Sequence, residues 1–325
     1  MDIPRRRFLR LAAWGGALAA APRAGWAQTY PVRPITLMVF VPAGGAPDIV
    51  ARVIGQSLSQ RLGQPIVIEN RPGGGGNLAL QAVARAPADG HTLLLVATPH
   101  AVNVTLYEKL NINVMRDIVP VASIDNDAFA VVVNPSIPAK TVPEFVAHVK
   151  SNPGKINMAS SGSGNLSHLA GELFKMMTGT EMVHVPYRGM PAANTALMTG
   201  EAHVLFNALP SVLPLLKDGK LRALAVTTEK RVKFLPDVPT VAASVPGYAV
   251  TGWLGVGVPK NTPPEIIARL NKEINAALAD PETLARLASL GSEPFTGSPT
   301  DFGKFIAVET EKWSKVVRFA GLKVN

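Results

Sequence analysis

The hydrophobic positions in the first third of the chain alternate between short apolar runs and helical spacing. Ile35–Val41 is a largely apolar run, as expected for a strand that is buried on both faces. In Pro47–Leu62 the apolar positions recur every four residues, which is typical of one helix face, and a glycine follows as a stop signal. The pattern then predicts strands at 65–69 and 92–98 with a helix at 77–86 between them. This alternation predicts a parallel sheet with right-handed crossovers.

The alternation is interrupted between residues 119 and 134. Two apolar strands are predicted there, at 119–124 and 128–133, with only three polar residues and no helix between them, which indicates a passage into a second lobe. The alternation then resumes, with predicted strands at 155–160, 182–187, 204–207, 221–227 and 247–259, and predicted helices at 142–151, 165–178, 191–199, 211–218, 264–279, 281–290 and 299–320.

These passages divide the chain into lobe 1, residues 28–125 and 250–325, and lobe 2, residues 126–249. Ligands of parallel sheets bind beyond the carboxyl ends of the strands, where strand meets helix. The pattern therefore predicts an α/β protein with two hinged lobes and a ligand cleft between them. One apolar stripe in the last helix is interpreted as core rather than as a ligand site: Phe302, Phe305, Ile306, Trp313, Val316 and Val317.

The first 27 residues predict an export signal. Arg5–Arg7 precede an apolar stretch of 11 residues, and Gly25-Trp26-Ala27 forms a small-x-small cleavage site. The apolar stretch is shorter than the ~20 residues of a membrane span. The order Arg-Arg-x-Phe-Leu-Arg resembles a twin-arginine signal with Pro4 in place of Ser or Thr, and a general secretory signal stays open as the alternative. We expect a periplasmic mature chain that begins near Gln28 and, without any Cys, carries no lipid anchor.

Composition narrows the classes of function. Because the sequence contains no Cys, an exported chain holds no disulfide and depends on packing for its stability. The net charge of +9 falls to +5 without residues 1–27, which hold five Arg and one Asp. Lys and Arg are scattered and only 6% of the residues are aromatic, so nucleic acid is not an expected partner. We expect a monomer whose mild positive charge suits a small anion.

The first strand-to-helix corner is the sequence Pro-Ala-Gly-Gly at 42–45. Its glycines are expected to leave backbone N–H groups uncovered, and the helix that follows adds a partial positive charge at its N-terminus. The candidate ligand contacts there are Ala43, Gly44, Gly45 and Ala46. Asp48, in the first helical turn, either caps the helix, which is the more frequent role, or accepts a hydrogen bond from a ligand.

The second corner combines hydroxyls, glycines and helix N–H groups, a set that can bind a carboxylate without a buried cation. Its candidate contacts are Ser161, Gly162, Ser163, Gly164 and Asn165. The alternative is an ordinary Gly/Ser loop with a helix cap. His168 lies one turn into the helix and either faces the cleft or is a core or capping histidine.

Three other strand ends supply further candidates. Thr98 and His100 end one strand, Tyr187 and Arg188 end another, and Asn207 ends a third. Arg188 is the best-placed cation for a ligand carboxylate, although most Arg side chains in proteins are simply exposed.

The sequence offers little that suggests catalysis. The six His residues lack metal-ligand spacing, there is no Cys nucleophile, and no Ser lies in a Gly-x-Ser-x-Gly elbow. No pair of carboxylates falls at two strand ends as an acid/base couple. The four glycines at 73–76 lack the spacing of a phosphate loop and are interpreted as a turn. We therefore expect neither an enzyme nor a metal or other cofactor.

With these corners identified, the whole mature chain resembles the extracytoplasmic solute receptors of tripartite tricarboxylate transporters, the Bug or TctC family. The segments that carry the resemblance are Tyr30-Pro31-x-Arg33-Pro34-Ile35, Pro42-Ala43-Gly44-Gly45 with Asp48, Val67-Ile68-Glu69-Asn70-Arg71-Pro72-Gly73, Asp89-Gly90-His91-Thr92-Leu93, Ser167-His168-Leu169-Ala170-Gly171-Glu172, His184-Val185-Pro186-Tyr187-Arg188-Gly189, Leu221-Arg222-Ala223-Leu224-Ala225-Val226 and Asp237-Val238-Pro239-Thr240. The presence of all these segments in this order is a specific sign of one family.

The resemblance implies a type II periplasmic binding protein that closes on a carboxylated solute and delivers it to membrane subunits similar to TctA and TctB. It implies that residues 43–48 and 161–165 hold the carboxylate, partly through ordered water. The chain departs from the family pattern at Pro47, where Ser or Thr is usual, at Val41, where Phe is frequent, and at Asn207, where an acidic residue is common. These departures favour a bulkier carboxylate that depends less on an amine.

Three other classes of function stay open at this point. A receptor read by a membrane sensor rather than by a permease would have the same sequence features. A periplasmic hydrolase or transferase would use the Ser-rich corner, and turnover of a bound ligand would identify it. The remaining alternative is a fold whose cleft is closed and empty.

Overall fold

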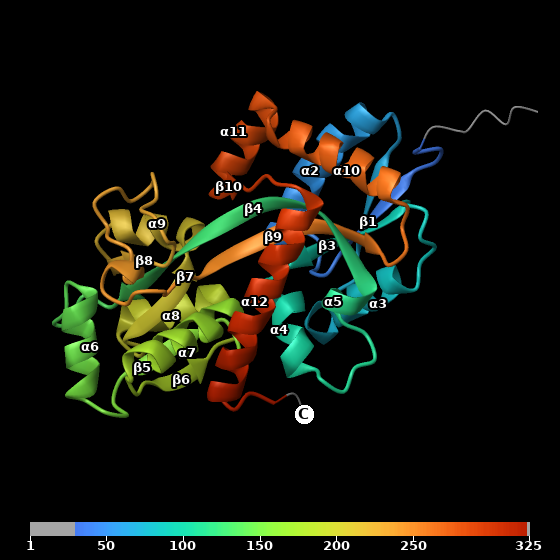
Figure 1. The fold of residues 1–325 in the computed structure, drawn as a ribbon. Helices are drawn as coiled ribbons and strands as arrows, with labels where there is room; N and C mark the ends of the chain where they lie inside the picture. Colours follow the sequence, from blue (N-terminus) through green and yellow to red (C-terminus); the bar gives the residue numbers. More distant parts are fainter. Residues whose placement is uncertain (1–29, 324–325) are drawn as a thin grey trace, which may run out of the picture.

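The computed structural model describes residues 30–323 and confirms the predicted α/β class (Figure 1). The predicted export signal at 1–27 lies outside the described residues. The strands are β1 (Ile35–Val39), β2 (Ile66–Asn70), β3 (Thr92–Ala97), β4 (Ile118–Val133), β5 (Asn157–Ser160), β6 (Val183–Pro186), β7 (Val204–Ala208), β8 (Arg222–Val226), β9 (Thr251–Pro259) and β10 (Ser292–Pro294). The α-helices are α2 (Ala46–Leu62), α3 (Asn77–Ala84), α4 (Thr98–Leu106), α5 (Val114–Asp117), α6 (Val142–Lys150), α7 (Leu166–Thr178), α8 (Met190–Thr199), α9 (Leu209–Lys217), α10 (Pro264–Leu278), α11 (Pro281–Ser289) and α12 (Pro299–Phe319).

The strands follow the order β2-β1-β3-β9-β4-β7-β5-β6, and β8 and β10 each pair with β4. The neighbours β2-β1-β3 are parallel, as are β7-β5-β6, which confirms the predicted parallel crossovers in both regions. We call β1, β2, β3, β9, β10 and the start of β4 the first half-sheet, and β5–β8 with the end of β4 the second half-sheet. Figure 1 shows the two half-sheets on opposite sides of the molecule, with β4 passing from one to the other.

One continuous strand makes this passage, where the sequence pattern predicts two. Residues Ile118–Ala128 of β4 pair with β9, and residues Phe129–Val133 pair with β7 and β8. Asp125–Asp127 remain extended because β9 and β10 pair with them from both sides. The expected break at these polar residues was therefore wrong, since pairing on both edges outweighs their local preference for a turn.

Helix α4 was also not expected from the hydrophobic pattern, which ends a strand at Thr98. Several β-branched residues weaken its helical signal. Pro99 in its first turn was the available clue, because proline is favoured at helix starts. As a result, the segment after β3 projects a helix toward the second half-sheet instead of a loop.

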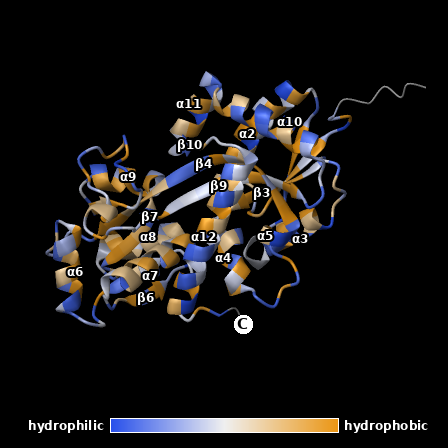
Figure 2. Cartoon of the chain, in the orientation of Figure 1, coloured by the Kyte–Doolittle hydropathy of each residue, from blue (hydrophilic) through white to orange (hydrophobic). Residues whose placement is uncertain are grey.

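Helices cover both faces of the first half-sheet. On one face α2 and α10 pack against β1, β3 and β9, with fully buried contacts such as Ile54, Leu95 and Ile274. A second core on the other face joins α3, α4, α7 and α12. In Figure 2 the ribbon of β3 is largely hydrophobic, while α2, α10 and α12 alternate between hydrophobic and hydrophilic residues. This contrast is expected when strands are buried on both faces and helices on one.

Helix α12 packs against β4, the strand shared by both half-sheets, and against two helices, α4 and α7. The predicted apolar stripe of this helix is confirmed as core, with Phe305 partly buried and the other five side chains buried. Its Glu309 is also buried and accepts hydrogen bonds from the indole nitrogens of Trp253 at 3.2 Å and Trp313 at 2.9 Å. Lys312 pairs with the same carboxylate and donates to the Ala249 carbonyl at 3.1 Å. One carboxylate thus fixes α12 to β9, close to the point where the chain returns to the first half-sheet.

A buried acid pair lies on β4 near the passage between the half-sheets. Ser292 Oγ is 2.7 Å from Asp125 Oδ2 and 3.2 Å from Asp127 Oδ1, and Asp125 is completely buried. Burial, and then the charge of Asp127, raise the pKa of the Asp125 carboxyl to about 8 against the opposing hydrogen bond from Ser292. The pair therefore keeps a proton at neutral pH.

We predict that Glu309→Ala lowers the free energy of unfolding by about 1–3 kcal/mol, because two buried indole N–H groups lose their acceptor. Thermal unfolding followed by tryptophan fluorescence measures the effect. Glu311→Ala on the same helix is the matched control: Glu311 pairs only with Lys315 and both side chains are exposed, so its loss should cost under about 1 kcal/mol. Equal losses for the two variants would contradict the role assigned to Glu309.

The acid pair predicts a pH dependence of stability. Its folded-state pKa lies above the unfolded value of 3.8, so the folded chain holds a proton that the unfolded chain releases, and stability is lost as the pH rises from about 4 to about 8. Asp125→Asn keeps the shape but cannot release the proton. Its free energy of unfolding should therefore gain on the wild type by up to about 1.4 kcal/mol per pH unit within this window. Denaturant unfolding at several pH values tests this, and parallel pH profiles would contradict it.

Candidate functional site

A cleft of about 330 Å³ lies between the two half-sheets. Its lining comes from four segments, namely Phe40–Pro42 after β1, residues 72–76 after β2, residues 99–107 of α4 and its end, and Ser163–Asn165 before α7. The loop before α7 thus contributes three of its predicted contacts to this surface, whereas the first corner contributes Pro42 and its predicted contacts at 43–46 do not line the cleft in this structure. The volume is near the lower end of the usual range for small-molecule sites.

The corner between β1 and α2 is closed by a single carboxylate. Asp48 is 1% exposed and accepts hydrogen bonds from Gly44 N at 2.8 Å and from Asn70 Nδ2 at 2.9 Å. Arg52 adds two further donors, at 3.0 Å each. Burial acts to raise the pKa of Asp48, but the hydrogen bonds from Arg52, Gly44 and Asn70 outweigh it and hold the pKa below its usual value. Asp48 is therefore a charged residue that fixes the shape of the corner.

This arrangement corrects the expectation that the glycines of the first corner present free N–H groups. Gly44 N is taken by Asp48, and Gly45 N donates to the Pro42 carbonyl at 3.2 Å. Within the described part of the chain, the N–H groups of Ala43 and Ala46 have no hydrogen-bond acceptor. Ala46 is the first residue of α2, where an N–H has no partner inside its own helix. The glycines shape the turn, and the neighbouring alanines offer the donors.

In the corner before α7, the glycine N–H groups are also bonded within the protein. Gly162 N donates to Ser160 Oγ at 3.2 Å and Gly164 N donates to His168 Nδ1 at 3.1 Å. Both glycines have positive φ, 136° and 78°, so residues with a side chain would be strained there. Ser163 lies between them, exposed, and neither its N–H nor its hydroxyl is bonded to another described residue. Ser163 is thus the residue of this loop whose polar groups are available to a ligand.

The remaining loop candidates have internal partners. Ser161 N donates to Ser167 Oγ at 3.0 Å, and the Ser161 hydroxyl is 3.1 Å from the same oxygen. Asn165, an exposed residue that lines the cleft, donates from Nδ2 to the Ser161 carbonyl at 3.0 Å and from its backbone N to the Gly162 carbonyl at 3.3 Å. His168 is 3% exposed and lies below the loop instead of facing the cleft.

The candidates at the other strand ends are more widely placed. His100 is completely buried behind Phe40 and accepts a hydrogen bond from Ala97 N at 3.0 Å, and burial lowers its pKa to about 4. Thr98 is 3% exposed. Asn207 is fully buried, with its amide 2.8 Å from Asn194 Oδ1. These three side chains are buried and do not line the cleft in this structure.

Tyr187 and Arg188 follow β6, beside the loop that precedes α7. Tyr187 N donates to the Ser160 carbonyl at 2.9 Å, which holds the two loops together. The Tyr187 hydroxyl donates to Glu201 at 2.9 Å. Arg188 is exposed and makes no ion pair with another described residue.

Sequence reasoning missed the wall of the cleft formed by the second glycine turn and α4. Gly73, Gly75 and Gly76 line the cleft, and Asn103 Nδ2 donates to the Gly75 carbonyl at 2.8 Å. The four glycines at 73–76 all have positive φ, which a simple turn into a helix does not require. The run of glycines was the available signal, but the helix that packs on them was not recognised.

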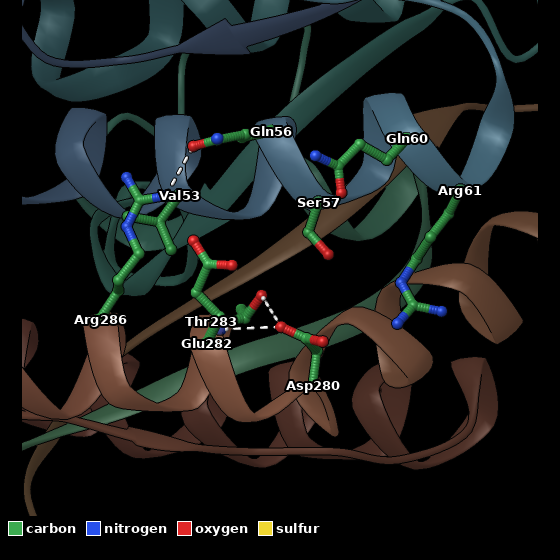
Figure 3. A pocket seen from close by; sticks show the side chains of 9 residues that line it. All are labelled: Val53, Gln56, Ser57, Gln60, Arg61, Asp280, Glu282, Thr283 and Arg286. Carbon is green, nitrogen blue, oxygen red and sulfur yellow. Dashed lines mark hydrogen bonds between the residues drawn. The ribbon is translucent and has the colours of Figure 1, made fainter.

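A second hollow, of about 210 Å³, lies between α2 and α11 (Figure 3). Four of its polar side chains pair with one another. Arg286 donates to Gln56 at 2.6 Å, and Asp280 accepts from Thr283 N at 3.0 Å as the cap of α11. It is lined by elements of the first half-sheet region alone. The cleft between the half-sheets is therefore the candidate site.

Residues 30–323 contain no group of three or more His, Cys, Asp or Glu side chains placed to hold a metal ion. None of the helices in this range has the length and apolar character needed to cross a lipid bilayer.

Comparison with known proteins defines the class. The model of the tripartite tricarboxylate transporter family receptor, TctC, matches residues 50–322. Protein BugT of Bordetella pertussis is 36% identical over 302 residues, which cover 92% of this chain and 93% of BugT. A solved R. palustris structure with adipate is 38% identical, has a TM-score of 0.76 and is matched over 90% of this chain and 98% of its own. MatC from Rhodopseudomonas palustris, with bound malate, is 33% identical with a TM-score of 0.73, over 89% and 100%.

The α/β architecture with a cleft between two half-sheets is that of a periplasmic solute-binding protein. This chain belongs to the TctC family of tripartite tricarboxylate transporter receptors.

We predict that Asp48→Ala lowers the free energy of unfolding by about 1–3 kcal/mol, because Gly44 N and Asn70 Nδ2 lose a buried acceptor. Arg52→Ala removes only the half-exposed partner of the same pair and should cost under about 1 kcal/mol. Thermal denaturation of the two variants measures the difference. A larger loss for Arg52→Ala would mean that the ion pair, rather than the buried hydrogen bonds, fixes the corner.

Proposed function

We propose that this protein captures a small carboxylate in the cleft between two lobes in the periplasm and delivers it to membrane subunits similar to TctA and TctB. In this proposal the chain is a receptor and not an enzyme. The export signal at 1–27 brings the chain to the periplasm, and the mature chain acts as a monomer.

The arrangement of the two corners carries this proposal. Helix α7, of 13 residues, begins directly after the cleft residue Asn165, and helix α2, of 17 residues, begins four residues after the cleft residue Pro42. Each helix adds a partial positive charge to the unpartnered N–H groups of its corner, at Ala43 and Ala46 on one side and at Ser163 on the other. Donors of this kind stabilise a carboxylate without a buried cation. The proposed ligand contacts are therefore residues 43–46 and 161–165.

The walls of the cleft suit the carbon skeleton of such an acid. Phe40, Leu106 and Tyr107 supply apolar and aromatic surface, and the lining includes no Asp or Glu that would repel an anion. Asn207 has no negative charge to bind an amine. Arg188, exposed on the neighbouring loop, is the proposed partner of a second carboxylate. These features support a dicarboxylate or another bulky acid rather than an amino acid.

Closure of the lobes would complete the site. We propose lobe 1 as residues 28–125 with 250–325 and lobe 2 as residues 126–249. The change of pairing along β4 between Ala128 and Phe129, and the return of the chain at Thr251, support these bounds to within a few residues. A ligand that contacts both corners favours the closed arrangement through the contacts it makes only there.

Two relatives support the ligand class. A structural neighbour at 38% identity was solved with adipate and another at 33% with malate, both of them dicarboxylates.

The test is a thermal-shift and calorimetric screen of the mature protein, Gln28 onward, with adipate, malate, aromatic acids and glutamate. A ligand at 100 times its Kd stabilises a protein by about 2.7 kcal/mol, which corresponds to a shift of roughly 5 °C or more. We expect a dicarboxylate to produce this shift and its neutral diamide to produce none. No shift with any acid, together with no acid released from the denatured protein in mass spectrometry, would refute the proposal.

A substitution in the loop before α7 tests where the ligand binds. Ser163→Trp fills the cleft from an exposed loop position and should weaken binding at least tenfold while the thermal unfolding of the free protein changes little. Ser151→Trp, on an exposed position of the same lobe outside the cleft, is the matched control and should bind as the wild type does. Unchanged binding by Ser163→Trp would place the ligand elsewhere.

A further inference from the structure

Two histidines lie stacked directly beneath the loop that precedes α7. The rings of His168 and His184 are nearly parallel, 8° apart, and their centroids are separated by 3.5 Å. His168 comes from the first turn of α7, which follows the loop, and His184 comes from β6, the strand that pairs with β5, which precedes the loop. Among the six histidines of the sequence, these two therefore have a shared position behind the proposed ligand loop.

The His168 ring has defined partners at both nitrogens. Gly164 N–H can only donate, so Nδ1, 3.1 Å away, must be an unprotonated acceptor. Nε2 lies 3.4 Å from Glu172 Oε1 and carries the proton of the neutral ring. Glu172 is 4% exposed and is also held by Lys175 at 2.9 Å. The carboxylate thus selects the tautomer that leaves Nδ1 free for the loop.

The His184 ring supports the other glycine of the loop. Its Nε2 lies 2.6 Å from Ser160 Oγ, and that hydroxyl accepts the hydrogen bond from Gly162 N at 3.2 Å. The two glycine turns on either side of Ser163 are therefore fixed by two rings that stack on each other. Ser163, which lines the cleft, lies between these two fixed glycines.

We propose that His168 and His184 are positioning residues for the ligand loop, and that binding of a proton at His168 Nδ1 releases Gly164 and loosens the loop. The part of this inference that concerns ligand affinity rests on the proposed function. The chemistry is exclusive: a protonated Nδ1 is a donor, and it cannot accept the Gly164 N–H. Acidification then converts an ordered donor loop into a less ordered one and weakens carboxylate binding.

The groups that face the two histidine rings come from α7 and β5. Glu172 and Lys175 on α7 face the pair, and β5 contributes the Ser160 hydroxyl. Among the described residues, β7 and α12, which also pack on α7, contribute no hydrogen bond or ion pair to either ring. Burial, and then the charge of His168, lower the pKa of His184 to about 4, so His184 stays neutral well below neutral pH.

The first experiment needs no ligand. NMR of the mature protein follows the Gly164 amide and the ring nitrogens of His168 from pH 8 to pH 5. We expect the exchange protection of the Gly164 amide to fall about five- to tenfold with the same midpoint as the His168 titration, the amount expected for one lost hydrogen bond. In His168→Asn, whose Oδ1 replaces Nδ1 as acceptor but cannot titrate, the protection should stay constant. Protection of Gly164 that is unaffected by His168→Leu at pH 7.5 would overturn the proposal.

The second experiment measures Kd for adipate and for malate at pH 7.5 and pH 5.5 by calorimetry. We expect the wild type to bind about five- to tenfold more weakly at pH 5.5, His168→Asn to bind equally at both, and His168→Leu to bind weakly at both. His148→Asn, the same change on α6 of the same lobe, should keep the wild-type pH dependence. A pH dependence that persists in His168→Asn would overturn the role in binding. If neither acid binds any variant, the proposed ligand class fails, while the amide measurement still decides whether the pair positions the loop.

Discussion

The pairing of β4 along its whole length is the constraint on which the rest of the structure depends. Its first part pairs with β9 and its last part with β7 and β8, so one strand belongs to both half-sheets. The cleft exists because the corners after β1 and after β5 approach each other across this strand. In the closure proposed above, β4 and β9 would bend near Asp127 and Gly252, where the buried acid pair and the adjoining Ser292 lie. The buried acid pair therefore lies beside the point where β4 passes from one half-sheet to the other.

The two corners that face the cleft are built by one device. In each, a glycine with positive φ donates its N–H to a side chain four residues later, at the third position of the helix that follows. The acceptor is Asp48 in the first corner and His168 in the second. The glycine turn is thus closed by its own helix, and the N–H of the preceding residue, Ala43 or Ser163, has no acceptor within residues 30–323. The chemical difference is that a carboxylate of lowered pKa stays an acceptor at physiological pH, whereas an imidazole does not stay one after it gains a proton.

A receptor of this kind gains from binding groups that are fixed before the ligand arrives. Loops with free glycines would lose conformational entropy on binding, and part of the binding energy would be spent on ordering them. The buried acceptors behind the loops avoid this cost, because Gly44 and Gly164 are already held. Three of the predicted contacts, His100, His168 and Asn207, are buried outside the cleft lining, and each has a hydrogen-bond partner inside the protein.

The sequence by itself determined the α/β class, the order of most elements, the two corners and the family, because these depend on local periodicity, on glycines and prolines, and on short motifs. Only the tertiary structure decided that β4 is continuous, since the edges of β9 and β10 override the turn preference of Asp125–Asp127. It also decided which polar groups form hydrogen bonds inside the protein. Whether an N–H of Gly44 or of Ala46 is free depends on a side chain that folding brings within hydrogen-bond distance, and hydrophobic spacing carries no information about that distance.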